Sequence, residues 1–280
     1  MSPYCQWHPN RYERFEKSYS TSIGTSLIVT DLGKAFIKPL GNRQGPHVLA
    51  CEWLATRLAD WFGLPTFSYA LMTVDEGDEI PLGGGNAATA GPAFVTKEET
   101  GFTWGGDAAE LDELQNPDDL SRLVVFDTWT RNCDRHPPDV TTRKPNYDNV
   151  FISTQGPDLG TQRLIAMDHT HCFTCGGDLT DRIAHIDRIN DPRVYGLFPA
   201  FVPRMRQTVV QGVSEHLLAL ETARVRQLVE SIPAEWQVSA DAKQALCDLI
   251  LQRAAFVARN IEQHLAPICW PDAGVNAQEE

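Results

Sequence analysis

One segment of the chain, FDTWTRNCDRHPPDVTTRKPNYDNVFIS at residues 126–153, constrains the fold more than any other. It places Asp134, Arg135 and His136 together, then a polar stretch with prolines, and then Asn149 near the start of an apolar run. Charged side chains, a histidine and an amide gathered around one loop require a chemical or a structural explanation.

A helix is predicted to lead into this cluster. In NPDDLSRLVVFDTWTRN, Asn116 is the expected N-cap, Pro117 takes the first helical position, and two aspartates follow in the first turn. The helix is expected to end near Arg131 and to deliver the chain to Asp134. After the polar stretch, the runs NVFIS and RLIAMD predict a small hairpin beside the helix.

The N-terminal part of the chain has a different character. TSLIVTDLGKAFIKPL alternates apolar and polar residues around a turn-prone DLGK, which predicts a β-hairpin with Lys38 on its second strand. Apolar residues at helical spacing predict a helix over 48–62 that carries Glu52. TFSYALMTV and GPAFVTKEE predict further strands. Residues 1–100 are therefore expected to form a mostly β lobe.

Residues 101–280 are predicted to be mostly helical. A long amphipathic helix is expected in DAKQALCDLILQRAAFVARNIEQHLAPI, where apolar residues mark one buried face. A length of 280 residues allows one large domain or two lobes that share an interface, and a composition of 42% hydrophobic and 22% charged residues is that of a folded globular protein. The sequence thus predicts a β-rich N-lobe and a helical C-lobe.

Composition also narrows the location and the partners. No run approaches the roughly 18 apolar residues of a membrane span, and the polar N-terminal stretch has no signal-peptide core. The 7 cysteines are odd in number and mostly scattered, which favours reduced thiols. A net charge of −13 opposes attraction to nucleic acid or anionic membranes. We expect a cytoplasmic protein with neither partner.

Groups suited to phosphoryl transfer follow one another along the chain. That chemistry needs a loop that supplies backbone amides to phosphates, a lysine with a glutamate that orients it, an Asn and an Asp that hold magnesium, and a carboxylate that accepts the hydroxyl proton. The candidates, in chain order, are Thr25, Ser26, Lys38, Glu52, the FVTK strand, Asp134, Asn149 and Asp168.

The motifs NCDRH, NYDNVFI and IAMDHTHCF resemble those of the HipA-like kinases, relatives of protein kinases and, in this motif, of phosphoinositide kinases. The resemblance implies that Asp134 is the catalytic base and that His136 is a catalytic-loop residue near the transferring phosphate. It implies that Asn149 and Asp168 are the magnesium ligands. The similarity spans roughly residues 22–173.

The same resemblance assigns the nucleotide site. AFIKP is similar to the family's ATP-lysine strand, which gives Lys38, and EWLATRLADWFGLP is similar to the following helix, which gives Glu52. Thr25 and Ser26 would contact phosphates. FVTK would be the hinge that contacts adenine through the backbone of Phe94, Val95 and Thr96.

Two departures from the family pattern stand out. The stretch PPDVTTRKPNYD separates His136 from Asn149, where the family keeps its catalytic Asp and metal-binding Asn about five positions apart. The loop must bulge outward, and Asn146 or Asp148 is an alternative metal ligand. The chain also starts about twenty residues before its phosphate loop, so a stand-alone kinase core is expected.

A zinc site is the alternative interpretation of DHTHCFTC. His169, His171, Cys172 and Cys175 are residue types that bind zinc. Structural zinc sites usually draw ligands from two separated knuckles, and no second Cys-x-x-Cys occurs in the sequence. Magnesium at Asp168 is therefore the preferred interpretation.

The sequence therefore predicts a kinase that uses ATP and Mg²⁺. The expected acceptor is a protein Ser/Thr hydroxyl, with a lipid or small-molecule alcohol as the alternative. Two other hypotheses use the same residues. One is a nucleotide-binding pseudokinase in which the inserted loop 137–148 presents a partner-binding surface, and the other is nucleotidyl transfer with ATP bound in reverse.

Overall fold

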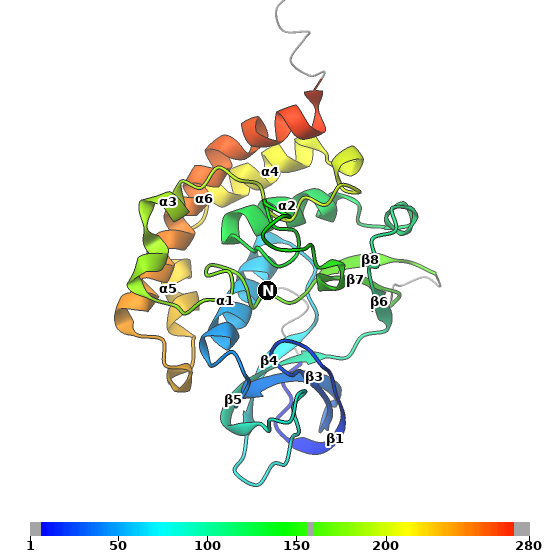
Figure 1. Cartoon of the computed structure of the whole chain (residues 1–280), viewed down its shortest axis with the longest axis vertical. Coiled ribbons are helices and arrows are strands. Elements are labelled where there is room, and N and C mark those ends of the chain that lie inside the picture. The colour runs from blue at the N-terminus through cyan, green and yellow to red at the C-terminus, as the bar shows by residue number, and fades with distance from the viewer. Residues whose placement is uncertain (1–6, 156–159, 272–280) are drawn as a thin grey trace, which may run out of the picture.

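The computed structural model describes residues 7–155 and 160–271. A five-stranded antiparallel sheet forms the N-terminal part, and helices form most of the remainder (Figure 1). The strand order is β1-β2-β3-β5-β4, with bounds β1 (Tyr12–Ser18), β2 (Ser26–Thr30), β3 (Gly33–Leu40), β5 (Thr89–Lys97) and β4 (Tyr69–Val74). The predicted α+β class is thereby confirmed.

The predicted hairpin is the centre of this sheet. β2 and β3 pair with Thr30 opposite Gly33 and Ser26 opposite Ile37. Gly33 has a φ of 101°, a conformation that glycine adopts without a Cβ penalty, and it closes the tight turn. This register continues to β5, where Lys38 stands opposite Phe94. The sheet thus sets Lys38 on a central strand.

α1 (His47–Phe62) joins the sheet to the helical part. It contacts β5 on one side and α2, α4 and α5 on the other. Its C-terminus ends at Gly63, whose φ of 82° lets the amide donate to the carbonyls of Ala59 and Asp60. Glu52 lies on the buried face of this helix and is 3% exposed.

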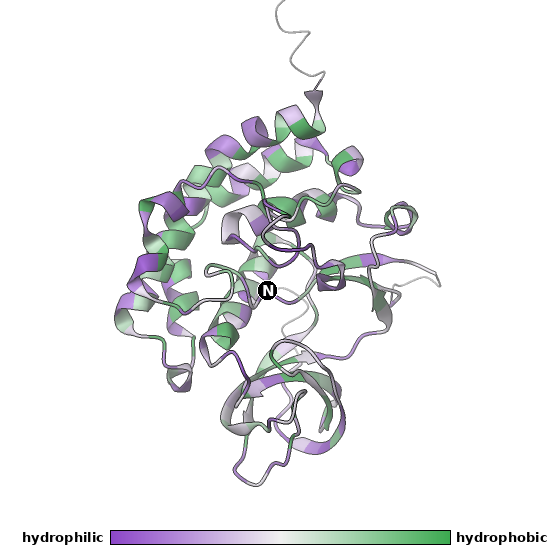
Figure 2. Cartoon of the chain, in the orientation of Figure 1, coloured by the Kyte–Doolittle hydropathy of each residue, from purple (hydrophilic) through white to green (hydrophobic). Residues whose placement is uncertain are grey.

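The C-terminal part contains a second, smaller sheet of order β6-β7-β8, which lies beside the helices and contacts α2 through β8 (Figure 1). Figure 2 shows hydrophobic and hydrophilic residues alternating along these helices, as amphipathic packing requires. The elements are β6 (Gly101–Thr103), α2 (Asp118–Thr130), β7 (Val150–Ser153), β8 (Arg163–Ala166), α3 (Ile186–Ile189), α4 (Gln207–Leu218), α5 (Thr222–Glu230) and α6 (Ala240–Cys269), with short 3₁₀ turns η2 (Ala109–Leu111), η3 (Tyr147–Asn149), η4 (Asp181–Ala184), η5 (Val202–Arg204) and η6 (Ala234–Trp236).

Two clusters of buried apolar residues stabilise the fold. The larger one unites α1, α2 and the C-terminal helices, and the smaller one lies within the N-terminal sheet around Ile28, Ile37 and Val95. The predicted helices over 48–62 and at the C-terminus are confirmed, as is the β7–β8 hairpin. In the described residues no helix has the length and apolarity to cross a membrane.

The start of α2 differs from the prediction by one residue. Pro117, not Asn116, is the N-cap, and no side chain caps the helix there. Asn116 instead bonds to β8, because its Oδ1 accepts from the Leu164 amide at 2.9 Å and its Nδ2 donates to the Leu164 carbonyl at 3.1 Å. The residue therefore ties the helix to the small sheet. The strands β1 and β6 were not predicted.

Candidate active site

A cavity of about 490 Å³ lies between the N-terminal sheet, α1 and the small sheet. Its walls combine aromatic side chains with a few charged groups, a combination suited to a nucleotide. The lining residues used below are Thr25, Phe36, Lys38, Glu52, Phe67, Phe94, Thr96, Glu98, Glu99, Asp148, Asn149, Phe151, Met167, Asp168 and His169.

Lys38 joins the two parts of the molecule by ion pairs. Its Nζ lies 3.1 Å from Glu52 Oε2 on α1 and 3.3 Å from Asp168 Oδ1 after β8. The same Glu52 oxygen accepts from the His169 amide at 2.7 Å. Burial opposes the charge on Lys38, but Asp168 and Glu52 together raise its pKa above the ordinary value. The lysine therefore stays a cation.

Asp168 has an unusual backbone conformation. Its φ is 55°, in the left-handed region that costs energy for a residue with a Cβ. The Thr170 hydroxyl donates to Oδ1 at 2.7 Å. Burial would raise the pKa of this carboxyl, yet Lys38, Thr170 and His171 hold it below the ordinary value. Asp168 is thus an anion on the cavity wall.

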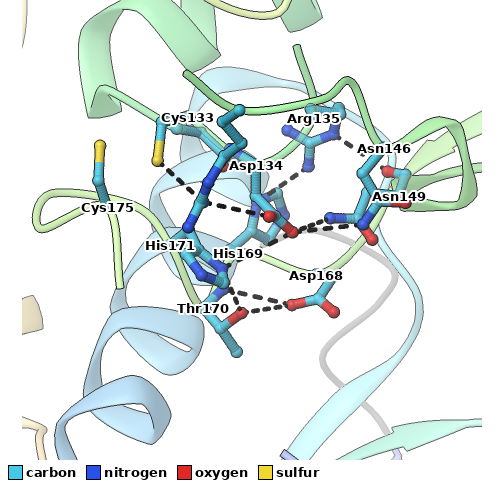
Figure 3. A network of polar contacts seen from close by, with 12 residues as sticks. Cys133, Asp134, Arg135, Asn146, Asn149, Asp168, His169, Thr170, His171 and Cys175 are labelled. Carbon is cyan, nitrogen blue, oxygen red and sulfur yellow. Dashed lines mark hydrogen bonds and ion pairs between the residues drawn. The ribbon is translucent and has the colours of Figure 1, made fainter. Parts of the chain in front are cut away.

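Asp134 accepts hydrogen bonds from two amides. Asn149 Nδ2 donates to its Oδ2 at 2.7 Å, and Asn146 Nδ2 donates to the same oxygen at 3.4 Å. Figure 3 shows Asn149 and Asp168 on the same side of Asp134. The structure therefore brings together three of the predicted catalytic and metal-binding residues.

Arg135 positions both predicted metal ligands from behind. Its side chain is 0% exposed and pairs with the equally buried Asp127. Nε donates to the Asn149 carbonyl at 3.0 Å, and Nη2 donates to the Met167 carbonyl at 2.8 Å, directly before Asp168. One guanidinium therefore fixes the start of β7 relative to the end of β8.

An arginine from the inserted loop 137–148 contacts Asp134. Arg143 Nη1 lies 3.2 Å from Asp134 Oδ1 and 3.2 Å from Cys133 Sγ. The loop returns to the site because the Asn146 amide donates to the Arg135 carbonyl at 2.8 Å. The insertion thus bulges outward, as expected, but also contributes to the catalytic loop.

The structure places His136 at the start of the inserted loop, away from the cavity wall. Its ring packs against Phe198 with centroids 5.1 Å apart, and it does not line the cavity. Phe198 also contacts Tyr147 and Trp104, so the two ends of the inserted loop meet at one aromatic cluster. His136 therefore anchors the start of the inserted loop by packing its ring on Phe198.

The histidine near Asp134 is His171. Its Nδ1 lies 3.7 Å from Asp134 Oδ2 and 3.3 Å from the Thr170 hydroxyl. Burial lowers the pKa of His171, although Asp134 and Asp168 oppose that shift. The imidazole is therefore held mostly neutral beside the carboxylate.

The zinc alternative is not supported. In residues 7–155 and 160–271, no group of three His, Cys, Asp or Glu side chains is arranged to hold a metal. His169 packs on Phe126 and contacts Arg135, and Cys172 donates to the Thr130 hydroxyl at 3.5 Å. These side chains point into the helical core in separate directions.

The predicted hinge residues lie on a central strand of the sheet. β5 lies between β3 and β4, so the backbone of 94–96 is paired on both sides and cannot meet adenine. Phe94 and Thr96 line the cavity, whereas Val95 belongs to the core of the sheet. In the described chain, the Glu98 carbonyl and the Glu99 amide form no internal hydrogen bond. They are the backbone groups available at this end of the cavity.

The two residues predicted to contact phosphates differ in their position relative to the cavity. Thr25 lines the cavity, and its amide donates to Thr21 Oγ1 at 2.9 Å in the loop between β1 and β2. Ser26 is fully buried, and its hydroxyl donates to the Pro81 carbonyl at 2.6 Å. The Ser26 side chain therefore does not face the cavity, because the next pleat of β2 turns it away.

The chemistry of the donor set fits magnesium. Mg²⁺ prefers oxygen ligands and is commonly bound by one or two side chains together with phosphates and water. In the part of the chain that the structure describes, Asn149 Oδ1 and Asp168 Oδ2 take part in no hydrogen bond or ion pair. Both residues line the cavity, so each offers an oxygen to a metal.

This fold and this site define a kinase-type phosphotransferase. The sequence matches the HipA-like kinase family over residues 31–265, from the β2–β3 turn through most of α6, so the chain belongs to that family. The resemblance stated from the motifs is thereby confirmed.

A solved structure supports the fold. The crystal structure of a Helicobacter pylori proinflammatory kinase, CtkA, superposes with a TM-score of 0.56 at 12% identity. The similarity covers 94% of this chain and 99% of that one. A comparison with curated proteins found no match.

Proposed function

We propose that the protein transfers the γ-phosphate of ATP to a hydroxyl group in a reaction that requires magnesium. The observation that carries this proposal is the joint placement of Lys38, Glu52 and Asp168 in one ion network, with Asp134 and Asn149 hydrogen-bonded beside it. Each charged group there has a separate task in phosphoryl transfer.

The nucleotide would enter the cavity with its base at Glu98 and Glu99, between the aromatic side chains of Phe36 and Phe151. Lys38, kept cationic by its two carboxylate partners, would bind phosphate oxygens. Its ion pair with Glu52 holds the ammonium toward the cavity, because α1 is fixed against both parts of the molecule.

Asp134 would orient the acceptor hydroxyl and accept its proton as the oxygen bonds to the γ-phosphorus and the bond to ADP breaks. Asn149 holds the carboxylate in place through the 2.7 Å hydrogen bond. Asn149 and Asp168 would hold magnesium, which supplies charge neutralisation at the phosphates when bound. Arg135 positions the backbone of both ligands.

The remaining parts of the proposal follow from the family and the sequence. We propose one kinase domain over 1–280, with the lobes meeting near residue 100, and a protein Ser/Thr hydroxyl as the first acceptor to test. A lipid or small-molecule alcohol is the alternative acceptor. A cytoplasmic location agrees with the free thiols of the 6 described cysteines.

The test compares α-labelled and γ-labelled ATP with the purified protein, magnesium and a lysate as the acceptor source. We expect the γ-label to be transferred and the α-label to stay with the nucleotide, and chelation of magnesium to stop the transfer. Transfer of the α-label would establish nucleotidyl transfer by the same residues. Binding of ATP with transfer of neither label would contradict the proposed function.

A pseudokinase is the second candidate, and one contact favours it. Arg143 pairs with the predicted base Asp134 through the inserted loop, and a guanidinium there neutralises the carboxylate that must accept a proton. The loop would then serve as a partner-binding surface.

Replacement of Arg143 separates the two candidates. If Arg143 orients Asp134 and binds the transferring phosphate, Arg143→Ala lowers kcat by about 10²-fold, the usual effect of losing one stabilising donor. Arg143→Lys should retain part of the activity because it keeps the charge. The exposed Arg11→Ala is the control. A gain of activity in Arg143→Ala would show instead that the arginine restrains the site.

A further inference from the structure

Two cysteines face each other beside Asp134, outside the nucleotide cavity. The thiols of Cys133 and Cys175 interact with one another, and Figure 3 shows their sulfur atoms side by side. Cys133 directly precedes Asp134, whereas Cys175 lies in the turn that follows Asp168. Neither residue lines the cavity.

The turn that carries Cys175 is held in a demanding conformation. Cys175 has a φ of 55°, in the left-handed region, and its amide donates to the His171 carbonyl at 3.0 Å. At the next position, a Cβ on Gly176 would lie 2.7 Å from the His171 ring. The turn therefore packs tightly on His171, which in turn contacts Asp134.

The two thiols differ in accessibility and reactivity. Cys175 is partly exposed and Cys133 is buried. The interaction with the Cys133 thiol, with smaller contributions from Arg131 and Arg143, outweighs burial and lowers the pKa of Cys175 to about 7. A thiolate of this kind is the reactive form of cysteine. By contrast, burial raises the pKa of Cys51 to about 12.

We propose that Cys133 and Cys175 form a reversible disulfide when hydroperoxides oxidise them, and that this bond stops phosphoryl transfer. The second half rests on the proposed function. The hydroperoxide is the oxidant. Cys175, which is partly exposed, reacts with it first, and the buried Cys133 then reacts with the oxidised Cys175 to form the disulfide.

The chemistry takes two steps. The Cys175 thiolate attacks the peroxide oxygen, the O–O bond breaks, and an alcohol or water leaves after taking up a proton. Cys133 then attacks the sulfur of the resulting sulfenic acid, the S–S bond forms, and water leaves. Two electrons pass from the sulfurs to the peroxide, and a dithiol reductant reverses the change.

The bond would move the catalytic loop. A disulfide of about 2.05 Å is much shorter than a thiol–thiol contact, so its formation draws Asp134 toward the His171 turn. It also removes the thiol that Arg143 contacts at 3.2 Å while that arginine holds Asp134. We expect transfer to fall by about 100-fold, the usual effect of a displacement near 1 Å, with ATP affinity unchanged.

The experiment treats the reduced full-length protein with hydrogen peroxide at neutral pH, blocks free thiols by alkylation, and maps peptides without reduction. We expect one linked pair of peptides, containing Cys133 and Cys175, and loss of γ-phosphate transfer that dithiothreitol restores. Cys133→Ser and Cys175→Ser should each abolish the link and the peroxide response, measured against their own reduced activity. Cys269→Ser, also a partly exposed cysteine, should keep both.

Each contrary result has a definite meaning. Absence of the link, or a link through another cysteine, overturns the proposal, as does complete linkage without a change in transfer. Transfer is measured first in the reduced sample, so failure of the proposed function appears before oxidation. Peptide mapping needs no activity and decides the disulfide independently.

Discussion

Asp134→Asn is expected to lower kcat by about 10²–10⁴-fold, the usual contribution of a general base. The amide has nearly the shape of the carboxylate and can still accept from Asn149, which donates to Asp134 Oδ2 at 2.7 Å. It cannot accept the hydroxyl proton. Because Asp134 does not line the nucleotide cavity, the KM for ATP should change little.

Steady-state transfer of γ-phosphate, with ATP affinity measured separately, checks this expectation. Asp187→Asn is a suitable control, since that carboxylate is 86% exposed and distant from the cavity. Its activity should match the unaltered protein. Full activity in Asp134→Asn would assign the proton acceptor to another group.

The second large effect concerns folding. Arg135→Leu is expected to reduce the free energy of unfolding by about 3–5 kcal/mol, because it leaves Asp127 as an uncompensated buried charge. Both side chains are 0% exposed. The carbonyls of Asn149 and Met167 also lose a donor, so transfer should fall as well. Urea unfolding measured by fluorescence gives the first quantity.

This loss should depend on pH in a defined direction. Burial already raises the pKa of Asp127 to about 6, and Arg135 is the first group that opposes the shift. Without Arg135 the folded-state pKa rises further. When the pKa of a carboxyl is higher in the folded state, the free energy of unfolding is greatest at a pH below the unfolded-state pKa. It falls as the pH rises, until the pH passes the folded-state pKa. The deficit of Arg135→Leu should therefore grow as the pH increases above about 6.

A double variant separates the buried charge from the positioning role. Asp127→Asn combined with Arg135→Leu removes both charges, so most of the stability and the pH dependence of the deficit should be recovered. The transfer activity should remain low, because the donor to Asn149 and Met167 is still absent. Recovery of activity together with stability would show that Arg135 acts only on folding.

Sequence reasoning succeeded where local pattern and chemistry agreed. The β2–β3 turn, the helix of Glu52 and the two aspartates at element ends all follow from short-range signals in the chain. These signals identify Lys38, Glu52 and Asp168, and the fold then brings both carboxylates within 3.3 Å of the Lys38 ammonium. Charge complementarity across such elements makes the pairing favourable.

It failed where the role of a side chain depends on packing between distant segments. His136 stands in the motif but faces Phe198, and Arg143 lies within an insertion yet reaches Asp134. Arg135 was read as part of a motif, although its burial against Asp127, eight positions earlier, makes it structural. The available signal was an arginine next to the predicted catalytic aspartate, eight positions after Asp127.

The hinge prediction failed for a topological reason. A run such as FVTK has the same appearance on an edge strand and on a central strand, and only the strand order decides whether its backbone is free. Here β4 pairs with the far side of β5, so the first backbone groups without an internal hydrogen bond in the described chain beyond β5 are the Glu98 carbonyl and the Glu99 amide.

The aromatic cluster of Trp104, His136, Tyr147 and Phe198 has a consequence for how this chain can vary. It fixes both ends of the inserted loop, so the exposed residues 140–142 can change in number while Arg143 and Asn146 keep their contacts with Asp134. Each doubling of the length of a flexible loop costs only about 0.6 kcal/mol in closure entropy. The exposed part of the loop can therefore change while the residues of the candidate site keep their positions. New substrate specificity can arise there with little loss of stability.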